Sequence, residues 1–248
     1  MRELRVVFVI VLALAVGNVA TAGAAFAQAD EEVEGLNRQA AQLYQTRKYD
    51  EAMPIAEKAL ALGEQRFGPD DARLGELLNN VALIHRAQSR LAEAEPFHKR
   101  ALAVQERVLG ADHASVGKTL IDLAELYAIQ KRFAEAEETY KRSLGIMEKA
   151  LGPGHTDVVP VLNGLAIVYR VQRRFEEAEP LYQRALAISE QAKGADHADV
   201  AATLDRLAAL YEARGRFVDA EPLYQRSLAI KERALGCLLY TSPSPRDS

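Results

Sequence analysis

The chain has 248 residues, of which 49% are apolar and 27% charged, and its formal net charge at pH 7 is −4. This composition excludes a disordered or fibrous chain, and the weak negative charge gives no basic field for phosphate backbones, so nucleic acid is not expected as a partner. A single Cys excludes an intramolecular disulfide and a cysteine-based zinc site, so packing alone must stabilise the fold.

The first 27 residues have the order of a secretory signal peptide. Two Arg and one Glu in residues 1–5 precede an apolar run over residues 6–16, and small residues then lead to Ala25-Phe26-Ala27, an A-x-A cleavage pattern. We expect cleavage before Gln28 and export of the protein, in a bacterium to the periplasm or beyond. The alternative is an uncleaved signal that anchors the protein in the membrane, because residues 6–27 are long enough to span a bilayer.

A repeating unit of about 42 residues organises the chain from residue 28 to residue 236. Five segments of the type FEEAEPLYQRALAI begin at a constant interval, at Tyr49, Leu91, Phe133, Phe175 and Phe217. Glycines close the units at the same interval, at Gly68, Gly110, Gly152, Gly194 and Gly236. The repeat boundaries that follow are residues 30–68, 69–110, 111–152, 153–194 and 195–236.

Each repeat predicts two helices. Leu162, Leu165, Ala166 and Tyr169 lie at i, i+3, i+4 and i+7, which is the apolar stripe of an amphipathic helix, and a second stripe runs through the segment that begins at Phe175. We therefore expect an all-α fold of ten helices and no strands. In the first repeat we match the stripe to Ala40-Ala41 and Tyr44 after one deleted residue. In the second helix, the recurring Ala, as at Ala178, is small enough to let two helix axes approach closely.

The Leu-Ala-x-x-Tyr pattern of the first helix and the spaced Ala and Tyr of the second resemble the tetratricopeptide repeat. The length of the unit, with Leu-Gly-(Ala/Pro)-(Asp/Gly)-His between units, is similar to the kinesin-light-chain variety of that repeat. The resemblance implies a right-handed α-solenoid of five stacked helix-turn-helix units. It also implies a concave groove, lined by the first helix of each repeat, that holds an extended peptide or a partner protein.

The resemblance places a candidate binding groove on a defined set of positions. These are Arg38, Gln42 and Gln45, then Asn79, Leu83 and Arg86, then Lys118, Ile121 and Glu125, then Asn163, Ile167 and Arg170, and finally Asp205, Ala209 and Glu212. The carboxamides of Asn79 and Asn163 can donate to and accept from a peptide backbone. The cationic side chains of Arg86, Lys118 and Arg170 can pair with an acidic side chain or a terminal carboxylate. We expect a protein partner that presents an extended, partly acidic segment.

We expect no catalytic, cofactor or metal site. Gly117-Lys118-Thr119 lacks the first glycine and the preceding strand of a phosphate-binding loop. His113, His155 and His197 recur once per repeat, so stacked helices hold them too far apart to share one metal ion, and we expect them to serve the entry of each helix. For the fourth repeat, Thr156 or Asp157 is the expected N-cap. His98 takes the place of Tyr182 and is expected in the core.

Residues 237–248, which follow the last closing glycine, resemble no repeat and look like the translation of a sequencing adapter, and we expect them to be unstructured. A natural flexible tail is the alternative. Two other functions stay open. In the first, the array is the front part of a larger enzyme, such as a peptidase fused to these repeats. In the second, the array is a self-associating scaffold, because the last helix leaves Leu223, Leu228 and Ile230 without a following repeat.

Overall fold

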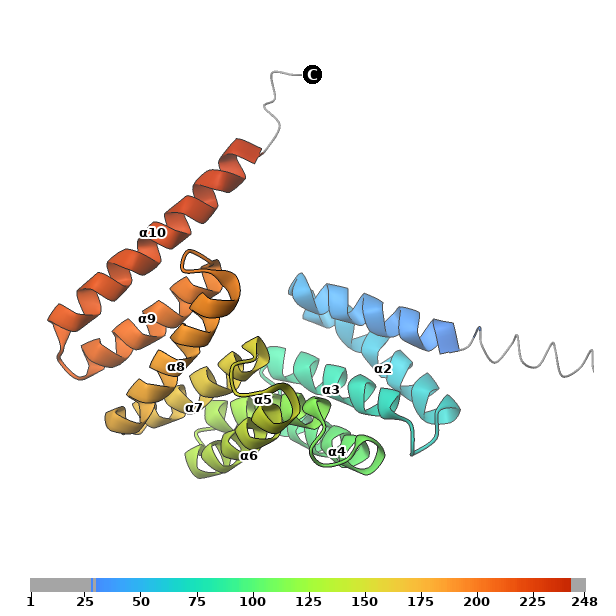
Figure 1. Ribbon diagram of the computed structural model, residues 1–248. Coiled ribbons are helices and arrows are strands. Elements are labelled where there is room, and N and C mark those ends of the chain that lie inside the picture. Colours follow the sequence, from blue (N-terminus) through green and yellow to red (C-terminus); the bar gives the residue numbers. More distant parts are fainter. Residues whose placement is uncertain (1–27, 29, 242–248) are drawn as a thin grey trace, which may run out of the picture. The chain divides into compact units, whose positions relative to one another are not determined.

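The structure is a computed structural model that describes residue 28 and residues 30–241. Within these residues it contains ten α-helices and no strand, which confirms the all-α prediction. The first helix covers residues 30–45. The others, labelled in Figure 1, are α2 (Tyr49–Arg66), α3 (Ala72–Ala87), α4 (Leu91–Leu109), α5 (Ala114–Ile129), α6 (Phe133–Leu151), α7 (Val159–Val171), α8 (Phe175–Lys193), α9 (Ala198–Ala213) and α10 (Phe217–Thr241). A short 3-10 helix, η1 (Thr156–Val158), leads into α7.

The chain divides into two compact units, one ending at Val108 and the other beginning at Leu109. In the first unit, side chains of the first helix, α2 and α3 form one apolar core around Ala40, Ala56 and Leu78. In the second unit, α5 packs on α6, α7 on α8 and α9 on α10, and α6 and α8 also pack on the helix that follows them. Figure 1 shows α9 and α10 side by side. The second unit therefore stacks helix pairs in chain order.

The turn inside each helix pair has the same backbone geometry in all five repeats. Its middle residue has a positive φ, and these residues recur once per repeat at Arg47, Ser89, Lys131, Arg173 and Gly215. The residue after each of them donates its N–H to a carbonyl five residues back, as Arg174 does to Tyr169 (2.9 Å) and Lys48 does to Leu43 (2.9 Å). So short a turn makes the two helices of each repeat antiparallel.

These turns show that the one-residue deletion assumed in the first repeat is wrong. Leu43 occupies the position of Tyr169, and Ala40, which is fully buried, occupies that of Ala166. A one-residue shift turns a helical side chain by about 100°. The first-repeat positions equivalent to Asn163, Ile167 and Arg170 are therefore Asn37, Ala41 and Tyr44, and not Arg38, Gln42 and Gln45, which are all exposed. The Leu-Ala-x-x-Tyr pattern gave the wrong register because Leu43 stands at the tyrosine position and a tyrosine, Tyr44, directly follows it.

The corrected register shows that the first helix has a polar outer face. In the other first helices of the repeats, three positions of that face are buried and apolar, for example Val200, Leu207 and Leu210 in α9. In the first helix the same positions hold Glu32, Gln39 and Gln42, all exposed. Polar residues at these positions match the outer face that a terminal solenoid repeat needs to stay soluble.

The recurring histidines cap the first helices of three repeats. Nδ1 of His113, His155 and His197 each accepts a hydrogen bond from the backbone N–H two residues on, at 3.1–3.2 Å. An N–H at a helix start has no intrahelical acceptor, so a side-chain acceptor here stabilises the turn. His155, rather than Thr156 or Asp157, is therefore the N-cap of η1 in the fourth repeat, which corrects that prediction.

Carboxylates on the second helices join successive repeats in the second unit. Glu137 of α6 accepts from the Tyr169 hydroxyl (3.3 Å) and pairs with Arg174, which holds the pKa of Glu137 low, at about 2. Glu179 of α8 likewise accepts from the Tyr211 hydroxyl (2.9 Å) and pairs with Arg214 (2.6 Å). We call each of these carboxylate contacts a repeat staple.

Helix α10 extends further than the sequence predicts. The closing glycines Gly68, Gly110, Gly152 and Gly194 have φ between 66° and 95°, a left-handed conformation that ends the preceding helix. Gly236 instead lies inside α10, which ends at Thr241, so residues 237–241 are helical and not unstructured. The reason is that residues 237–241 contain neither Gly nor Pro, so nothing in that sequence stops the helix.

The predicted signal peptide, residues 1–27, lies outside the described residues, as do residues 242–248 of the predicted adapter segment. In the part of the chain that the structure describes, no helix combines the length and the hydropathy needed to cross a bilayer.

Candidate functional site

The second unit contains a cavity of about 620 Å³ that is lined mainly by the first helices of three successive repeats. Its lining comprises Glu125, Ala128 and Ile129 of α5, Tyr140 of α6, Thr156 and Asp157 of η1, Val159, Pro160, Asn163, Gly164 and Ile167 of α7, Ser189 and Lys193 of α8, and Asp199, Ala202, Thr203 and Arg206 of α9. The volume is in the range of cavities that hold a ligand or a segment of a partner.

Asn163 is a buried polar residue of the cavity whose side chain has no hydrogen-bond partner among the described residues. Its side chain is 8% exposed, its carboxamide oxygen is buried, and it forms no side-chain hydrogen bond with any described residue. The other buried polar residues of the lining differ, since Ser189 donates to the carbonyl of Ala185 (2.9 Å) and Thr203 to that of Asp199 (3.2 Å). A buried carboxamide without partners is unfavourable, so Asn163 is prepared for a ligand with both donors and acceptors.

Gly164 makes room for the ring of Tyr140 in the wall of the cavity. A Cβ at position 164 would lie 2.4 Å from the nearest ring atom of Tyr140, which is itself 2% exposed. Gly145 of α6 is also helical, but a Cβ there would meet nothing within 4 Å.

We expect Gly164→Ala to lower the free energy of unfolding by about 1 kcal/mol, because Tyr140 must move within a packed wall. Gly145→Ala is the matched control, and it should raise the free energy of unfolding by about 0.5–1 kcal/mol, because Ala favours the helix more than Gly does. Urea unfolding followed by circular dichroism measures both changes. Equal effects of the two substitutions would contradict the close contact at Gly164.

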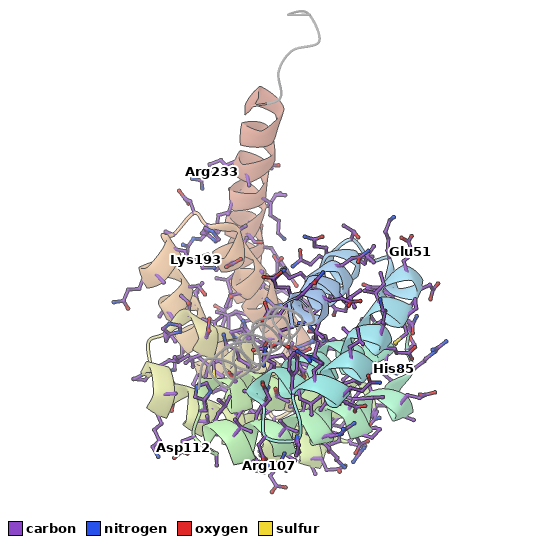
Figure 2. The ribbon with its side chains drawn as sticks, turned by 90° about the vertical axis from the view of Figure 1, so that its right-hand side faces the viewer. Glu51, His85, Arg107, Asp112, Lys193 and Arg233 are labelled. Carbon is purple, nitrogen blue, oxygen red and sulfur yellow. The ribbon has the colours of Figure 1, made fainter. Side chains whose placement is uncertain are left out.

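Two of the carboxylates that line the cavity are paired with lysines, whereas Arg206 forms no ion pair in the described chain. Asp157 pairs with Lys118 (2.8 Å) and Asp199 with Lys193, and these amines hold the pKa of both carboxyls below their usual range. Lys193, labelled in Figure 2, lies at the C-terminal end of α8. Arg206 donates to the carbonyl of Ala202 (3.0 Å) and forms no ion pair with any described residue. The guanidinium of Arg206 is therefore available to an anionic group in the cavity.

The structure brings three of the predicted groove residues, Glu125, Asn163 and Ile167, together in this cavity. Three others of the second unit lie outside the lining and contact neighbouring side chains. Lys118 pairs with Asp157, Asp205 pairs with Lys231 of α10 (2.5 Å), and Glu212 accepts from the hydroxyl of Tyr224 (2.9 Å). Of the remaining predicted residues of this unit, Ile121 is buried, whereas Arg170 and Ala209 are half-buried and outside the lining.

Arg206 was missed from the sequence because the carried-over pattern selects Asp205 beside it. Arg206 stands one full repeat after Gly164, so the two residues occupy the same position in their repeats, and both line the cavity. Because glycine has no side chain, the sequence of the fourth repeat gives no sign that this position lines a cavity. The sequence does show that no acidic residue stands three or four positions from Arg206, where a helical ion pair could form. Only the fold, however, shows that position 206 lines the cavity.

In the first unit, Asn79 contacts the core rather than standing free. Its carboxamide oxygen lies 2.8 Å from Nδ1 of His98, which is fully buried. Leu83 and Arg86 of the same helix are half-buried. An alanine at position 79 would therefore disturb the core as well as any ligand contact, so Asn79 is a poor position for testing binding.

A smaller cavity of about 220 Å³ lies in the first unit, beside the first helix. Arg38 and the correctly registered Asn37 both line it, together with Val33, Glu34, Phe67, Arg73, Glu76 and Leu77. Asn37 accepts a hydrogen bond from Asn80 (2.7 Å), and Arg38 lies 3.6 Å from Glu34. Arg73 is held by Asp71 (2.7 Å), so these charges around the cavity are already paired.

No site for a metal ion is apparent in the described part of the chain, where no group of three or more His, Cys, Asp or Glu side chains is suitably placed. The three capping histidines are each occupied with a backbone N–H, and His98 is buried beside Asn79.

The chain belongs to the tetratricopeptide repeat family, whose model matches residues 32–103, 73–149 and 157–233. No curated protein matches it at a significant level. Among solved structures, BtubC (BKLC) from P. vanneervenii is similar, with a TM-score of 0.70 and 23% identity over 90% of this chain and 94% of that one. A putative kinesin light chain from Podospora anserina, described as having nearly identical TPR-like repeats, has a TM-score of 0.70 and 22% identity over 82% of this chain and 96% of that one.

A more distant neighbour is pilF of Pseudomonas aeruginosa, with a TM-score of 0.60 and 16% identity over 82% of this chain and 78% of that one. At these identities the similarity shows the fold. The family match shows tetratricopeptide repeats, which generally mediate contacts between proteins.

Proposed function

We propose that this protein binds an extended, acidic segment of a partner protein in the cavity of its second unit. The observation that carries the proposal is the combination of a buried carboxamide without partners, at Asn163, and a half-buried guanidinium without an ion pair among the described residues, at Arg206, in the same cavity. Ile167 and Ile129 add apolar surface to the lining. A backbone amide can bond to Asn163 while an acidic side chain pairs with Arg206.

The supporting charges favour an acidic over a basic segment. Asp157 and Asp199 are already neutralised by Lys118 and Lys193, so the cavity has a cation to offer and few unpaired carboxylates of its own. A basic segment would have to displace these lysines, which costs existing ion pairs. We also propose that the protein is exported, for which the A-x-A pattern at residues 25–27 is the support.

The binding proposal is tested with the full chain and two fluorescein-labelled peptides of about ten residues, one alternating Asp with Val and the other alternating Lys with Val. Fluorescence anisotropy should show saturable binding of the acidic peptide. Arg206→Ala should weaken that binding by about tenfold, and Arg206→Glu should reverse the preference between the peptides. Asn163→Ala should weaken binding of the acidic peptide without reversing the preference.

Arg233→Ala is the matched control, because Arg233 is exposed on α10 and pairs with Asp196 outside the cavity lining. It should leave the affinity unchanged. If Arg206→Ala and Arg233→Ala weaken the acidic peptide equally, or if neither peptide binds, the cavity is not the binding site.

A further inference from the structure

The hydroxyl of Tyr182 is a buried donor without an acceptor. Tyr182 is 0% exposed, and its hydroxyl forms no hydrogen bond with any described residue. The carboxamide oxygen of Asn163 and Nε of Arg170, both on the adjoining helix α7, are likewise buried without partners. Buried polar atoms in folded proteins nearly always have partners, so three such atoms on two packed helices indicate a place where a ligand binds.

The second repeat shows that Asn163 stands beside the aromatic ring of Tyr182. Asn79 and His98 occupy the positions of Asn163 and Tyr182 two repeats earlier in the sequence. There the carboxamide oxygen of Asn79 lies 2.8 Å from Nδ1 of His98, so the residues at these two positions meet. The same contact is not formed in the fourth repeat.

The fifth repeat shows that Arg170 faces the Tyr182 hydroxyl. Tyr224 has the position of Tyr182 one repeat later, and its hydroxyl donates to Glu212 (2.9 Å), which has the position of Arg170. The fourth repeat thus has a guanidinium where the fifth has a carboxylate. Because a guanidinium can only donate, it cannot accept the hydroxyl proton, and both groups lack an acceptor.

A second guanidinium approaches the same hydroxyl from α9. Arg206 stands one repeat after Gly164, and a Cβ at Gly164 would lie 2.5 Å from the hydroxyl oxygen of Tyr140, the residue one repeat before Tyr182. The side chain of Arg206 therefore begins beside the Tyr182 hydroxyl. Burial raises the pKa of Tyr182, and the nearby charges of Arg170 and Arg206 act against that rise.

The two guanidiniums have no carboxylate that neutralises them. Neither Arg170 nor Arg206 forms an ion pair with any described residue, and the acidic residues one repeat after Asn163 and Arg170 are engaged elsewhere. Asp205 pairs with Lys231 (2.5 Å), and Glu212 accepts from a tyrosine. One carboxylate would neutralise only one of the two cations, whereas a phosphate monoester carries a charge of about −1.5 to −2 at pH 7 and three acceptor oxygens.

We propose that Arg170, Tyr182 and Arg206 bind a phosphate group. Each guanidinium can donate two parallel hydrogen bonds to the phosphate, and the Tyr182 hydroxyl can donate a further one. Asn163 and Arg206 line the cavity of the second unit, which gives the phosphate its way in. The phosphate is either a free ion or part of a phosphorylated side chain of the bound segment, and in the second case the inference rests on the proposed function.

The first test compares two fluorescein-labelled peptides on the full chain. One is the peptide that alternates Asp with Val, and the other is a copy in which one central Asp is replaced by phosphoserine. Anisotropy should show about tenfold tighter binding of the phosphopeptide. Arg170→Met and Tyr182→Phe should each reduce that ratio of affinities to less than about twofold. Tyr182→Phe removes only a hydroxyl without a partner, so thermal unfolding should show that the fold is kept.

The second test, a calorimetric titration of the full chain with inorganic phosphate, distinguishes the two sources. Saturable binding that Arg170→Met abolishes, without any advantage of the phosphopeptide, assigns the site to the free ion. An advantage of the phosphopeptide without binding of the ion assigns it to the bound segment. Arg233→Met is the matched control, because it removes a guanidinium outside the cavity lining, and it should change neither measurement.

The proposal is overturned if inorganic phosphate does not bind and the two peptides bind equally, a result that leaves the proposed function intact. It is also overturned if Arg233→Met weakens phosphate or phosphopeptide binding as much as Arg170→Met does. If neither peptide binds, the proposed function fails, and the titration with inorganic phosphate alone decides whether the phosphate site exists.

Discussion

Acidification from pH 7 to pH 5 is expected to destabilise the first unit by about 2 kcal/mol through His98 alone. His98 is fully buried, with Nδ1 2.8 Å from the carboxamide oxygen of Asn79 and Nε2 buried without a hydrogen-bond partner in the described residues. Protonation would place a charge and an unpaired N–H in the core. Burial first, and the nearby Arg86 second, lower the pKa of His98 to about 3.

The direction of the pH effect follows from that lowered pKa. In the unfolded chain His98 takes up a proton near its ordinary pKa of about 6.5, whereas the folded chain keeps it neutral until about pH 3. The stability is therefore fully present above pH 6.5 and is lost progressively as the pH falls from 6.5 towards 3. Each pH unit in that range costs about 1.4 kcal/mol.

His98→Gln should remove this dependence, because glutamine does not titrate and its amide can still donate to Asn79. Urea unfolding of both proteins at pH 7, 6 and 5 measures the difference in slope. Tyr182→His is the converse variant, and it should make the free energy of unfolding of the second unit fall as the pH is lowered. The reason is that Asn163 and Tyr182 have the same positions in their repeat as Asn79 and His98. Parallel pH profiles for the unmodified and His98→Gln proteins would contradict the prediction.

Ala178→Leu is expected to lower the free energy of unfolding of the second unit by about 3 kcal/mol. Ala178 is 0% exposed, and its equivalents Ala52, Ala94 and Ala136 are also 0% exposed. Helix axes cross at about 8–10 Å only when the contact residues are small, so a larger side chain must push α8 away from its neighbours or leave its rotamer.

Ala187→Leu is the matched control, because Ala187 lies on the same helix and is exposed. Leucine and alanine have similar helix propensities, so this variant should change the free energy of unfolding by less than about 0.5 kcal/mol. Thermal and urea unfolding by circular dichroism measure both variants. Equal stability of the two variants would show that the buried alanine does not set the helix separation.

The repeat period predicted the helices well, but two local predictions were wrong, one at Gly236 and one in the first repeat. The ten helices of the described residues and their order follow from the constant spacing of the units, and four of the five closing glycines end a helix as the spacing predicts. Gly236 was expected to end a helix as the other four glycines do, but no breaker follows it before residue 242. In the first repeat, matching Tyr44 to the tyrosine position moved the register by one residue, although strict periodicity gives the observed Leu43.

The candidate site was less predictable than the fold, because a side chain's neighbours come from other repeats. Asn163 and Ile167 both line the cavity, because their phase within α7 puts them on the same side of the helix. Whether a charge is available depends on a second residue. Asp205 is taken up by Lys231, whereas Arg206 next to it has no ionic partner in the described chain, and nothing in the local sequence distinguishes the two.

The sequence by itself determined the class of fold, the number of helices and the polar or apolar character of each position, because these depend on spacing along one chain. The tertiary structure decided which of those positions meet. It joined Glu137 and Glu179 to the tyrosines and arginines of the next repeat, and gathered Asn163 and Arg206 in one cavity. The physical reason is that burial and ion pairing depend on distances between helices. Residues that meet, such as Glu137 and Tyr169, lie 32 positions apart in sequence, and packing rather than local pattern brings them together.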